Sequence, residues 1–180
     1  MARTRSAVQE EIRQTRPFSS AAEEGVVALA RTADLLRREL TRVVEAHDIT
    51  LQQYNVLRIL RGAGEAGLAT LDIAGRMVER APGVTRLVDR LLARGLVRRQ
   101  RGTEDRRQIR CWITPGGLRL LAGLDGPMPE AARAFMAPLG ATDLGRFIEM
   151  LDALRAGAAP TAPPVRSGHG LRRPHFQGER

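Results

Sequence analysis

The stretch GLVRRQRGTEDRRQIRCWIT, from Gly95 to Thr114, decides the fold of this chain. Two short runs of strand-forming residues flank a turn that is rich in arginine and acidic side chains. Leu96 and Val97 begin the first run, so we expect a two-stranded β-hairpin. A hairpin with arginines at its tip can reach into a DNA groove.

The second strand shows the alternation of a half-buried strand. Ile109, Cys111 and Ile113 are apolar, and Arg110 and Trp112 stand between them. One face of the hairpin should therefore be packed and the other solvated. We interpret Cys111 as a buried structural thiol. Trp112 points outward, where it either packs on a neighbouring helix or contacts DNA.

Two short helices are expected before the hairpin, within residues 70–94. Thr70 should cap the first, LDIAGRMV, with Leu71, Ala74 and Met77 facing inward. Pro82 fits the first turn of the second helix. Helix, helix, hairpin is the order of a winged helix-turn-helix, so we predict a DNA-binding protein.

The second helix has one apolar face and one polar face. Its apolar positions recur at helical spacing and comprise Val84, Leu87, Val88, Leu91 and Leu92. Its outward positions are then Gly83, Thr85, Arg86, Asp89 and Arg90. Bases are read mainly from the first half of such a helix, so Thr85 and Arg86 are the expected readers and Arg90 a phosphate contact. The alternative is an ordinary solvated helix face.

The distribution of charge supports this interpretation. All 29 basic residues are arginine, which reflects codon usage or phosphate and base recognition. Residues 70–114 hold eleven arginines against five acidic residues, an excess of six in a formal net charge of +9. Charge gathered in one segment is typical of a surface that faces nucleic acid.

The remainder of the chain is predicted to be mainly helical. An apolar stripe that includes Val26, Leu29 and His47 predicts one helix over 21–48. Thr50 and Gln53 form a capping box that starts the next helix, which the glycine-rich run GAGEAG, 62–67, should end as a loop. Helical stretches follow over 115–136 and 142–156. We interpret 1–20 as a mobile arm that can hold one helical turn, and 157–180 as a disordered basic tail.

Several functional classes are disfavoured. One cysteine excludes an internal disulfide, and no run approaches the roughly 20 apolar residues of a membrane span. No signal peptide is recognised, so we expect a cytoplasmic protein without membrane association. The three histidines are far apart, and no spacing suggests a metal, cofactor or catalytic nucleophile. We therefore expect neither an enzyme nor a cofactor.

The motifs VTRLVDRL, GLVRR, DRRQIRCWIT and the following PGG resemble the MarR family of bacterial transcription regulators in order and spacing. The resemblance covers residues 21–156. It implies a mainly α fold with a small β-hairpin wing, in which a winged helix-turn-helix lobe (50–114) is embedded between dimerisation helices (21–48 and 115–156). It also implies an obligate homodimer on a short palindromic operator.

The resemblance also assigns DNA-binding roles. Thr85 and Arg86 match the base readers of the recognition helix, and Asp105 and Arg107 match a wing clamp in which the carboxylate orients the guanidinium for the minor groove. The alternative for that pair is a surface ion pair of little energetic weight. The resemblance further places Arg106 beside the clamp and Arg98 and Arg99 near the DNA backbone. The sequence ERAPG departs from the common Ser or Thr cap before the helix.

Many members of the family release DNA when a small aromatic or phenolic ligand enters a cleft beside the DNA-binding lobe. His47, Tyr54 and Arg58 are the polar candidates for such a site. The alternative for His47 and Tyr54 is a buried polar tip with one satisfied partner.

The expected function is thus a dimeric, sequence-specific regulator of transcription on double-stranded DNA, acting as a ligand-responsive repressor. The alternative is a winged-helix protein-interaction module, because a fold does not by itself fix a function. The alternative predicts no salt-dependent binding to duplex DNA, whereas the regulator predicts a steep salt dependence.

Overall fold

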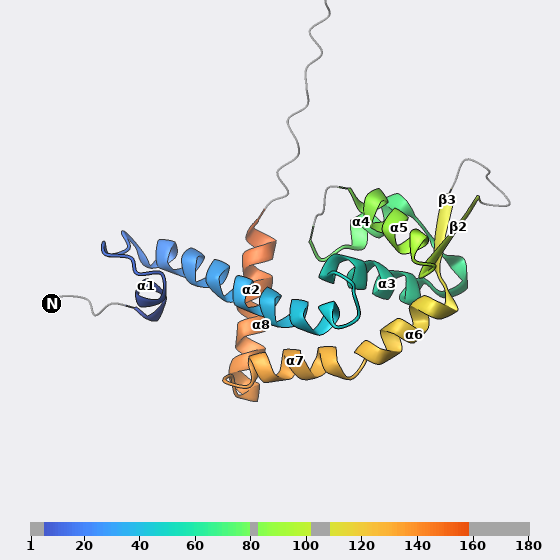
Figure 1. The fold of residues 1–180 in the computed structure, drawn as a ribbon. Helices are drawn as coiled ribbons and strands as arrows, with labels where there is room; N and C mark the ends of the chain where they lie inside the picture. Colours follow the sequence, from blue (N-terminus) through green and yellow to red (C-terminus); the bar gives the residue numbers. More distant parts are fainter. Residues whose placement is uncertain (1–5, 80–82, 102–108, 159–180) are drawn as a thin grey trace, which may run out of the picture. The chain divides into compact units, whose positions relative to one another are not determined.

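The computed structural model describes residues 6–79, 83–101 and 109–158, and it divides into two compact units with the boundary between Ala137 and Pro138 (Figure 1). The first unit contains α1 (Ala7–Glu11), α2 (Ala21–Glu45), α3 (Leu51–Ala63), the 3-10 turn η1 (Gly64–Ala66), β1 (Leu68–Ala69), α4 (Thr70–Arg76), α5 (Val84–Ala93), β2 (Val97–Arg101), β3 (Ile109–Ile113), α6 (Pro115–Leu124) and α7 (Pro127–Met136). The second unit contains α8 (Ala141–Gly157). The fold is mainly α with a small antiparallel sheet, as the sequence predicts.

The segment before α2 contains one short helix, α1, of the length that the sequence allowed for. Gln9 in α1 is only 6% exposed, and its amide Nε2 donates to the carbonyl of Arg16 at 3.1 Å. Glu11 forms an ion pair with Arg31 of α2 at 3.2 Å. The mobility expected of residues 1–20 stays a prediction.

Helix α3 begins as predicted and ends later than predicted. The Thr50 hydroxyl accepts from the Gln53 backbone N–H at 3.2 Å, and the Gln53 side chain accepts from the Thr50 N–H at 2.9 Å, which confirms the capping box. Gly62 and Ala63 continue the helix, and η1 follows at once. The prediction of a loop over 62–67 is wrong for these residues.

Helix α4 differs most from the prediction. Thr70 is its first residue and caps nothing, since the N-cap is Ala69. Leu71 is 85% exposed, whereas Ile73 is fully buried. With only seven residues, the helix carries too few apolar positions to fix which face is inward. Both predictions, the Thr70 cap and the inward Leu71, are wrong.

Helix α5 packs beside β2 (Figure 1). Its predicted inward face is buried, as the burial of Val84, Val88 and Leu91 shows. The helix begins at Val84, after Gly83 at φ +92°, so Pro82 precedes the helix and lies outside the described residues. A glycine here lets the chain turn into the helix through a left-handed conformation.

The sheet has three strands in the order β1-β3-β2, all antiparallel. The hairpin of β2 and β3 was predicted, whereas the two-residue strand β1, which pairs Leu68 with Cys111, was not. Cys111 is fully buried, as predicted. After β3, the Thr114 hydroxyl accepts from the Gly117 N–H at 3.1 Å and starts α6.

Apolar side chains remain uncovered in both units. In the first unit, Val26 of α2 is 68% exposed, and Leu29 is also exposed. In the second unit, α8 exposes Ile148, Met150 and Leu154. Within the described ranges, no helix is both long enough and apolar enough to cross a membrane.

Gly67→Ala should destabilise the protein by about 3 kcal/mol, from the cost of a left-handed backbone with a side chain and from overpacking. Gly67 has φ +58°, and a Cβ there would lie 2.5 Å from the Trp112 ring and 2.9 Å from the Cys111 carbonyl oxygen. Urea unfolding followed by circular dichroism, at one fixed protein concentration, measures the change.

Gly62→Ala is the matched control. Gly62 lies within α3, and no atom lies within 4 Å of a Cβ built there. This change should stabilise by about 0.5 kcal/mol, because alanine is the better helix former. Equal effects of the two changes would contradict the close contact between Gly67 and Trp112.

Candidate nucleic-acid interface

The outward face of α5 is the first part of the candidate interface. All five residues assigned to it from the sequence are exposed, and they are Gly83, Thr85, Arg86, Asp89 and Arg90. Because Gly83 has no side chain to cap the helix, the first N–H groups of α5 can face an anion. The structure therefore brings the expected readers Thr85 and Arg86 to one solvent-exposed turn.

The strand β2 presents two arginines on opposite sides. Arg98 is exposed and stacks on Trp112, with its guanidinium carbon 4.4 Å from the ring centroid. Its guanidinium also donates to the Gln100 side chain at 3.2 Å. Arg99 faces α5 instead, where its guanidinium donates to the Asp89 carboxylate at 2.6 Å. The sequence did not predict this difference between neighbours.

Arg99 lies between α5 and the sheet. Burial lowers the pKa of Arg99, but hydrogen bonds to Asp89 and to Cys111 outweigh it, and the pKa is raised above its ordinary value. Since arginine is a cation at physiological pH in any case, these contacts fix the position of the guanidinium and not its charge. Arg99 is thus paired within the protein and Arg98 is exposed, and the expectation that both lie near the DNA backbone stays a prediction.

The base of the wing is anchored to η1. The indole N–H of Trp112 donates to the carbonyl of Glu65 at 2.8 Å, and Arg110 donates to the carbonyl of Ala66 at 2.9 Å. Of the two alternatives for Trp112, packing is the one observed, although against η1 and not a regular helix. Asp105, Arg106 and Arg107 of the wing tip lie outside the described residues.

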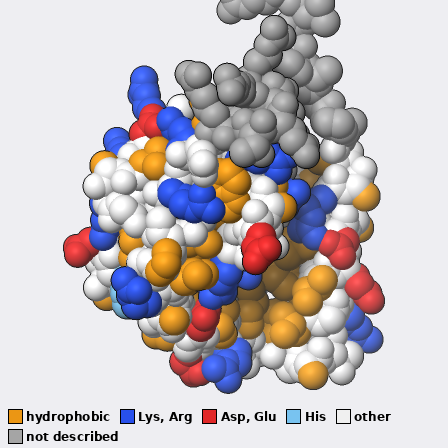
Figure 2. Space-filling view, turned by 90° about the vertical axis from the view of Figure 1, so that its right-hand side faces the viewer, with side chains coloured by type: hydrophobic (Ala, Val, Ile, Leu, Met, Phe, Trp, Pro, Cys, Tyr) orange, Lys and Arg blue, Asp and Glu red, His pale blue; other side chains and the backbone are white. Residues whose placement is uncertain are grey.

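Figure 2 views the side of the molecule that lies at the right of Figure 1, where the strands are. Arginine side chains are spread over this face, and acidic side chains lie among them with apolar side chains between. The capacity to contact phosphates therefore belongs to single exposed cations, such as Arg86, Arg90 and Arg98.

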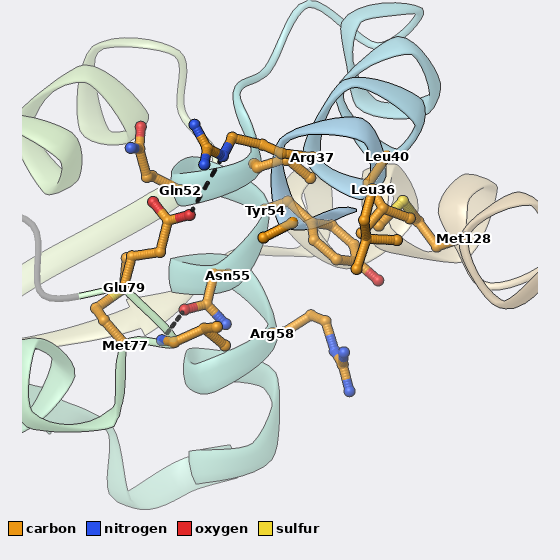
Figure 3. A pocket seen from close by; sticks show the side chains of 13 residues that line it. Leu36, Arg37, Leu40, Gln52, Tyr54, Asn55, Arg58, Met77, Glu79 and Met128 are labelled. Carbon is orange, nitrogen blue, oxygen red and sulfur yellow. Dashed lines mark hydrogen bonds and ion pairs between the residues drawn. The ribbon is translucent and has the colours of Figure 1, made fainter. Parts of the chain in front are cut away.

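A cavity of about 420 Å³ lies between α2, α3, α7 and the residues that follow α4 (Figure 3). Its lining is mostly apolar and comprises Ala33, Leu36, Arg37, Leu40, Leu51, Gln52, Tyr54, Asn55, Arg58, Met77, Val78, Glu79 and Met128. Two of the predicted ligand residues, Tyr54 and Arg58, line it, and the Arg58 guanidinium carbon lies 5.8 Å from the Tyr54 ring centroid.

His47, the third predicted ligand residue, does not line this cavity. Its imidazole lies against α6, where a Cβ at Gly123 would be 3.1 Å from His47 Cε1. The backbone carbonyl of His47 accepts from the Arg94 guanidinium at 3.5 Å. The carbonyl of Asp48 is a second acceptor for the same guanidinium. This position agrees with the alternative of a packed imidazole for His47, whose ligand role stays a prediction.

One wall of the cavity leads directly to the recognition helix. The Val78 backbone N–H donates to the Asn55 side chain at 3.0 Å, and Glu79 lies 3.9 Å from Arg37 of α2 (Figure 3). Sequence reasoning missed Asn55, Arg37 and Glu79, because nothing in their spacing shows that they share a cavity. The segment before α5 is therefore held by side chains of α3 and α2.

Among the residues that the structure describes, no three histidine, cysteine, aspartate or glutamate side chains are grouped closely enough to hold a metal ion.

Comparison with known proteins places these features in one family context. The sequence profile of the MarR family matches residues 49–109. The crystal structure of a MarR transcription factor from Planctomyces limnophilus is 36% identical, covers 76% of this chain and 99% of its own, and superposes with a TM-score of 0.59.

Two further solved structures share the fold. The S. aureus MepR–DNA complex is 19% identical, with a TM-score of 0.68 and coverage of 78% of this chain and 99% of MepR. The PcaV transcriptional regulator from Streptomyces coelicolor, solved with its natural ligand, is 23% identical, with a TM-score of 0.65. The match covers 80% of this chain and 100% of PcaV.

Proposed function

The chain belongs to the MarR family of transcription regulators, and from this premise we propose that it acts as a dimeric, ligand-responsive repressor on a short palindromic operator in the cytoplasm. The observation that carries the proposal is the solvent-exposed face of α5, with Thr85 and Arg86 in its first turn, beside an arginine-bearing wing. The remaining observations concern the dimer and the ligand.

DNA binding follows from the chemistry of this face. A guanidinium near the start of a recognition helix can donate two hydrogen bonds to guanine, and a threonine can contact either base edge. Arg90, one turn after Arg86, suits a phosphate. Arg98, exposed and stacked on Trp112, is a second phosphate contact. MepR, which shares the fold, was solved bound to DNA.

Dimerisation is supported by the uncovered apolar side chains. Val26 and Leu29 of α2 and Ile148 and Leu154 of α8 are exposed. A second copy of the chain that covers these helices removes this apolar surface from water. Two copies related by a twofold axis also present two recognition helices, which explains why a palindromic operator is expected.

Ligand response is supported by the cavity between α2 and α3. Its volume of about 420 Å³ suits one small molecule. The apolar walls favour an aromatic ring, and Tyr54 and Arg58 offer polar contacts for a phenol or carboxylate. PcaV, which shares the fold, was solved with its natural ligand. We propose a small aromatic or phenolic effector for this chain.

Selection of bound sequences from random duplex DNA tests the function as a whole. We expect an enriched palindrome, bound with an affinity that falls steeply as salt rises. Light scattering at micromolar concentration should give the mass of a dimer. Binding that is absent or independent of salt would favour the protein-interaction alternative, and a monomer would contradict the proposed architecture.

Arg86→Ala should reduce the preference for the selected operator over random DNA by about 1–3 kcal/mol, since a bidentate base contact carries that much discrimination. Arg42→Ala is the control, because Arg42 pairs with Glu39 at 2.7 Å on the exposed side of α2. Fluorescence anisotropy with labelled duplexes gives both affinities. If Arg86→Ala keeps the preference of the wild type, Arg86 is not a base reader.

Asn55→Ala should uncouple the cavity from DNA binding. We expect the anionic aromatic probe 1-anilinonaphthalene-8-sulfonate to bind the cavity of the wild type. The bound probe should weaken operator binding by about tenfold, and bound operator should weaken probe binding by the same factor. In Asn55→Ala the probe should still bind, but probe and operator should no longer weaken each other's binding. The reason is that the Val78 N–H loses its hydrogen bond to the Asn55 side chain.

Probe fluorescence with and without operator DNA measures this coupling in both directions. Gln52→Ala is the matched control, since Gln52 lines the same cavity on the same helix. Equal coupling in Asn55→Ala and the wild type would show that the contact between Asn55 and Val78 does not transmit ligand binding.

A further inference from the structure

We propose that Arg99 is a positioning residue of the recognition helix: its ion pair with Asp89 keeps the one acidic side chain of α5 from capturing Arg86 and from repelling DNA. This inference rests on the proposed DNA binding and differs from the role that the family resemblance gives Arg99, a contact to the DNA backbone. Three observations carry it.

The first observation is the geometry of the pair. The Arg99 guanidinium lies 2.6 Å from the Asp89 carboxylate, and the two side chains are 29% and 51% exposed. Arg99 pairs with the fully buried Cys111 in the sheet register and faces the same side of the sheet. Its Nε is buried and finds no partner among the described residues. A guanidinium held in this way is not a mobile surface cation.

The second observation is the place of Asp89 on α5. Asp89 follows Arg86 by three residues and precedes Arg90, and all three side chains are exposed. Side chains three apart on a helix are neighbours and pair readily. Without Arg99, the Asp89 carboxylate would hold Arg86 away from the bases, and its charge would oppose the approach of phosphates.

The third observation is the contrast with Arg98. The two arginines are adjacent in β2, so their side chains lie on opposite faces of the sheet. Arg98 stacks on Trp112 and stays exposed, whereas Arg99 turns toward α5. The cation that remains available to a phosphate is therefore Arg98, and Arg99 compensates a charge within the protein.

A double-mutant cycle on Arg99 and Asp89 tests the assignment. The four proteins are the wild type, Arg99→Met, Asp89→Asn and the double variant, and each is titrated with operator and with random duplex at several salt concentrations. Arg99→Met should weaken operator binding by about tenfold, within the range usual for coupled residues, and should lower the preference for operator. The slope of log affinity against log salt should stay unchanged.

The double variant should recover most of the lost affinity and preference, because removing the Asp89 charge removes the need for Arg99. Asp89→Asn alone should bind operator at least as tightly as the wild type. Arg98→Met is the matched control on the other face of β2. It should reduce the salt slope by about 0.9, the value for one phosphate contact in B-form DNA.

A phosphate contact by Arg99 gives the opposite pattern and would overturn the proposal. In that case Arg99→Met reduces the salt slope by about 0.9, and the loss of affinity persists in the Asp89→Asn background. If Arg99→Met does not fold, Arg99→Gln replaces it in the same cycle. The glutamine amide can still donate a hydrogen bond to Asp89, but it carries no charge. A wild type that fails to bind duplex DNA overturns both proposals, whereas additive effects in a wild type that binds overturn only this one.

Discussion

The burial of α3 is the constraint on which the rest of the first unit depends. Val56, Leu57 and Leu60 are fully buried, and the helix packs against α2, α4, α5, α6 and β3. These neighbours include both the recognition helix and the wing, so a rigid α3 fixes the position of each. The other side of the helix carries Tyr54 and Asn55 into the cavity. One element therefore supports the DNA-facing surface and forms a wall of the proposed ligand site.

Arginine is the only basic residue type in the chain, and its side chains serve several purposes. Arg61 binds Asp125, the residue after α6, through two contacts at 2.8 and 2.9 Å, and Arg94 and Arg110 donate to backbone carbonyls. A planar guanidinium can satisfy such acceptors while its stem packs on apolar neighbours. The excess of positive charge over 70–114 therefore overcounts the free cations of that segment. Arg99 shows this most clearly, since its charge is matched inside the protein by Asp89.

Sequence reasoning succeeded where an element is long or has a specific cap. The five apolar positions of α5 define its inward face, and the capping box at Thr50 places the start of α3. It failed for short elements, where tertiary contacts decide. The seven residues of α4 cannot fix which of Leu71 and Ile73 is buried, and the two residues of β1 have no pattern of their own. The side chains around the cavity come from four separate segments, so Asn55 and Glu79 could not be found without the fold.

The contacts that α3 and α2 make with Val78 and Glu79, before the recognition helix, are weak, and this suits a regulator. One hydrogen bond contributes about 0.5–1.5 kcal/mol, and an exposed ion pair such as Arg37 with Glu79 contributes about 1 kcal/mol or less. A tenfold change in DNA affinity requires about 1.4 kcal/mol. The free energy of these two contacts is therefore as large as that of a tenfold change in DNA affinity. A ligand that replaces both contacts can alter DNA binding while the buried side chains of α3 stay in place. Val78 and Glu79 are the residues that these contacts hold, whereas Met77 belongs to the buried core and anchors the start of the segment.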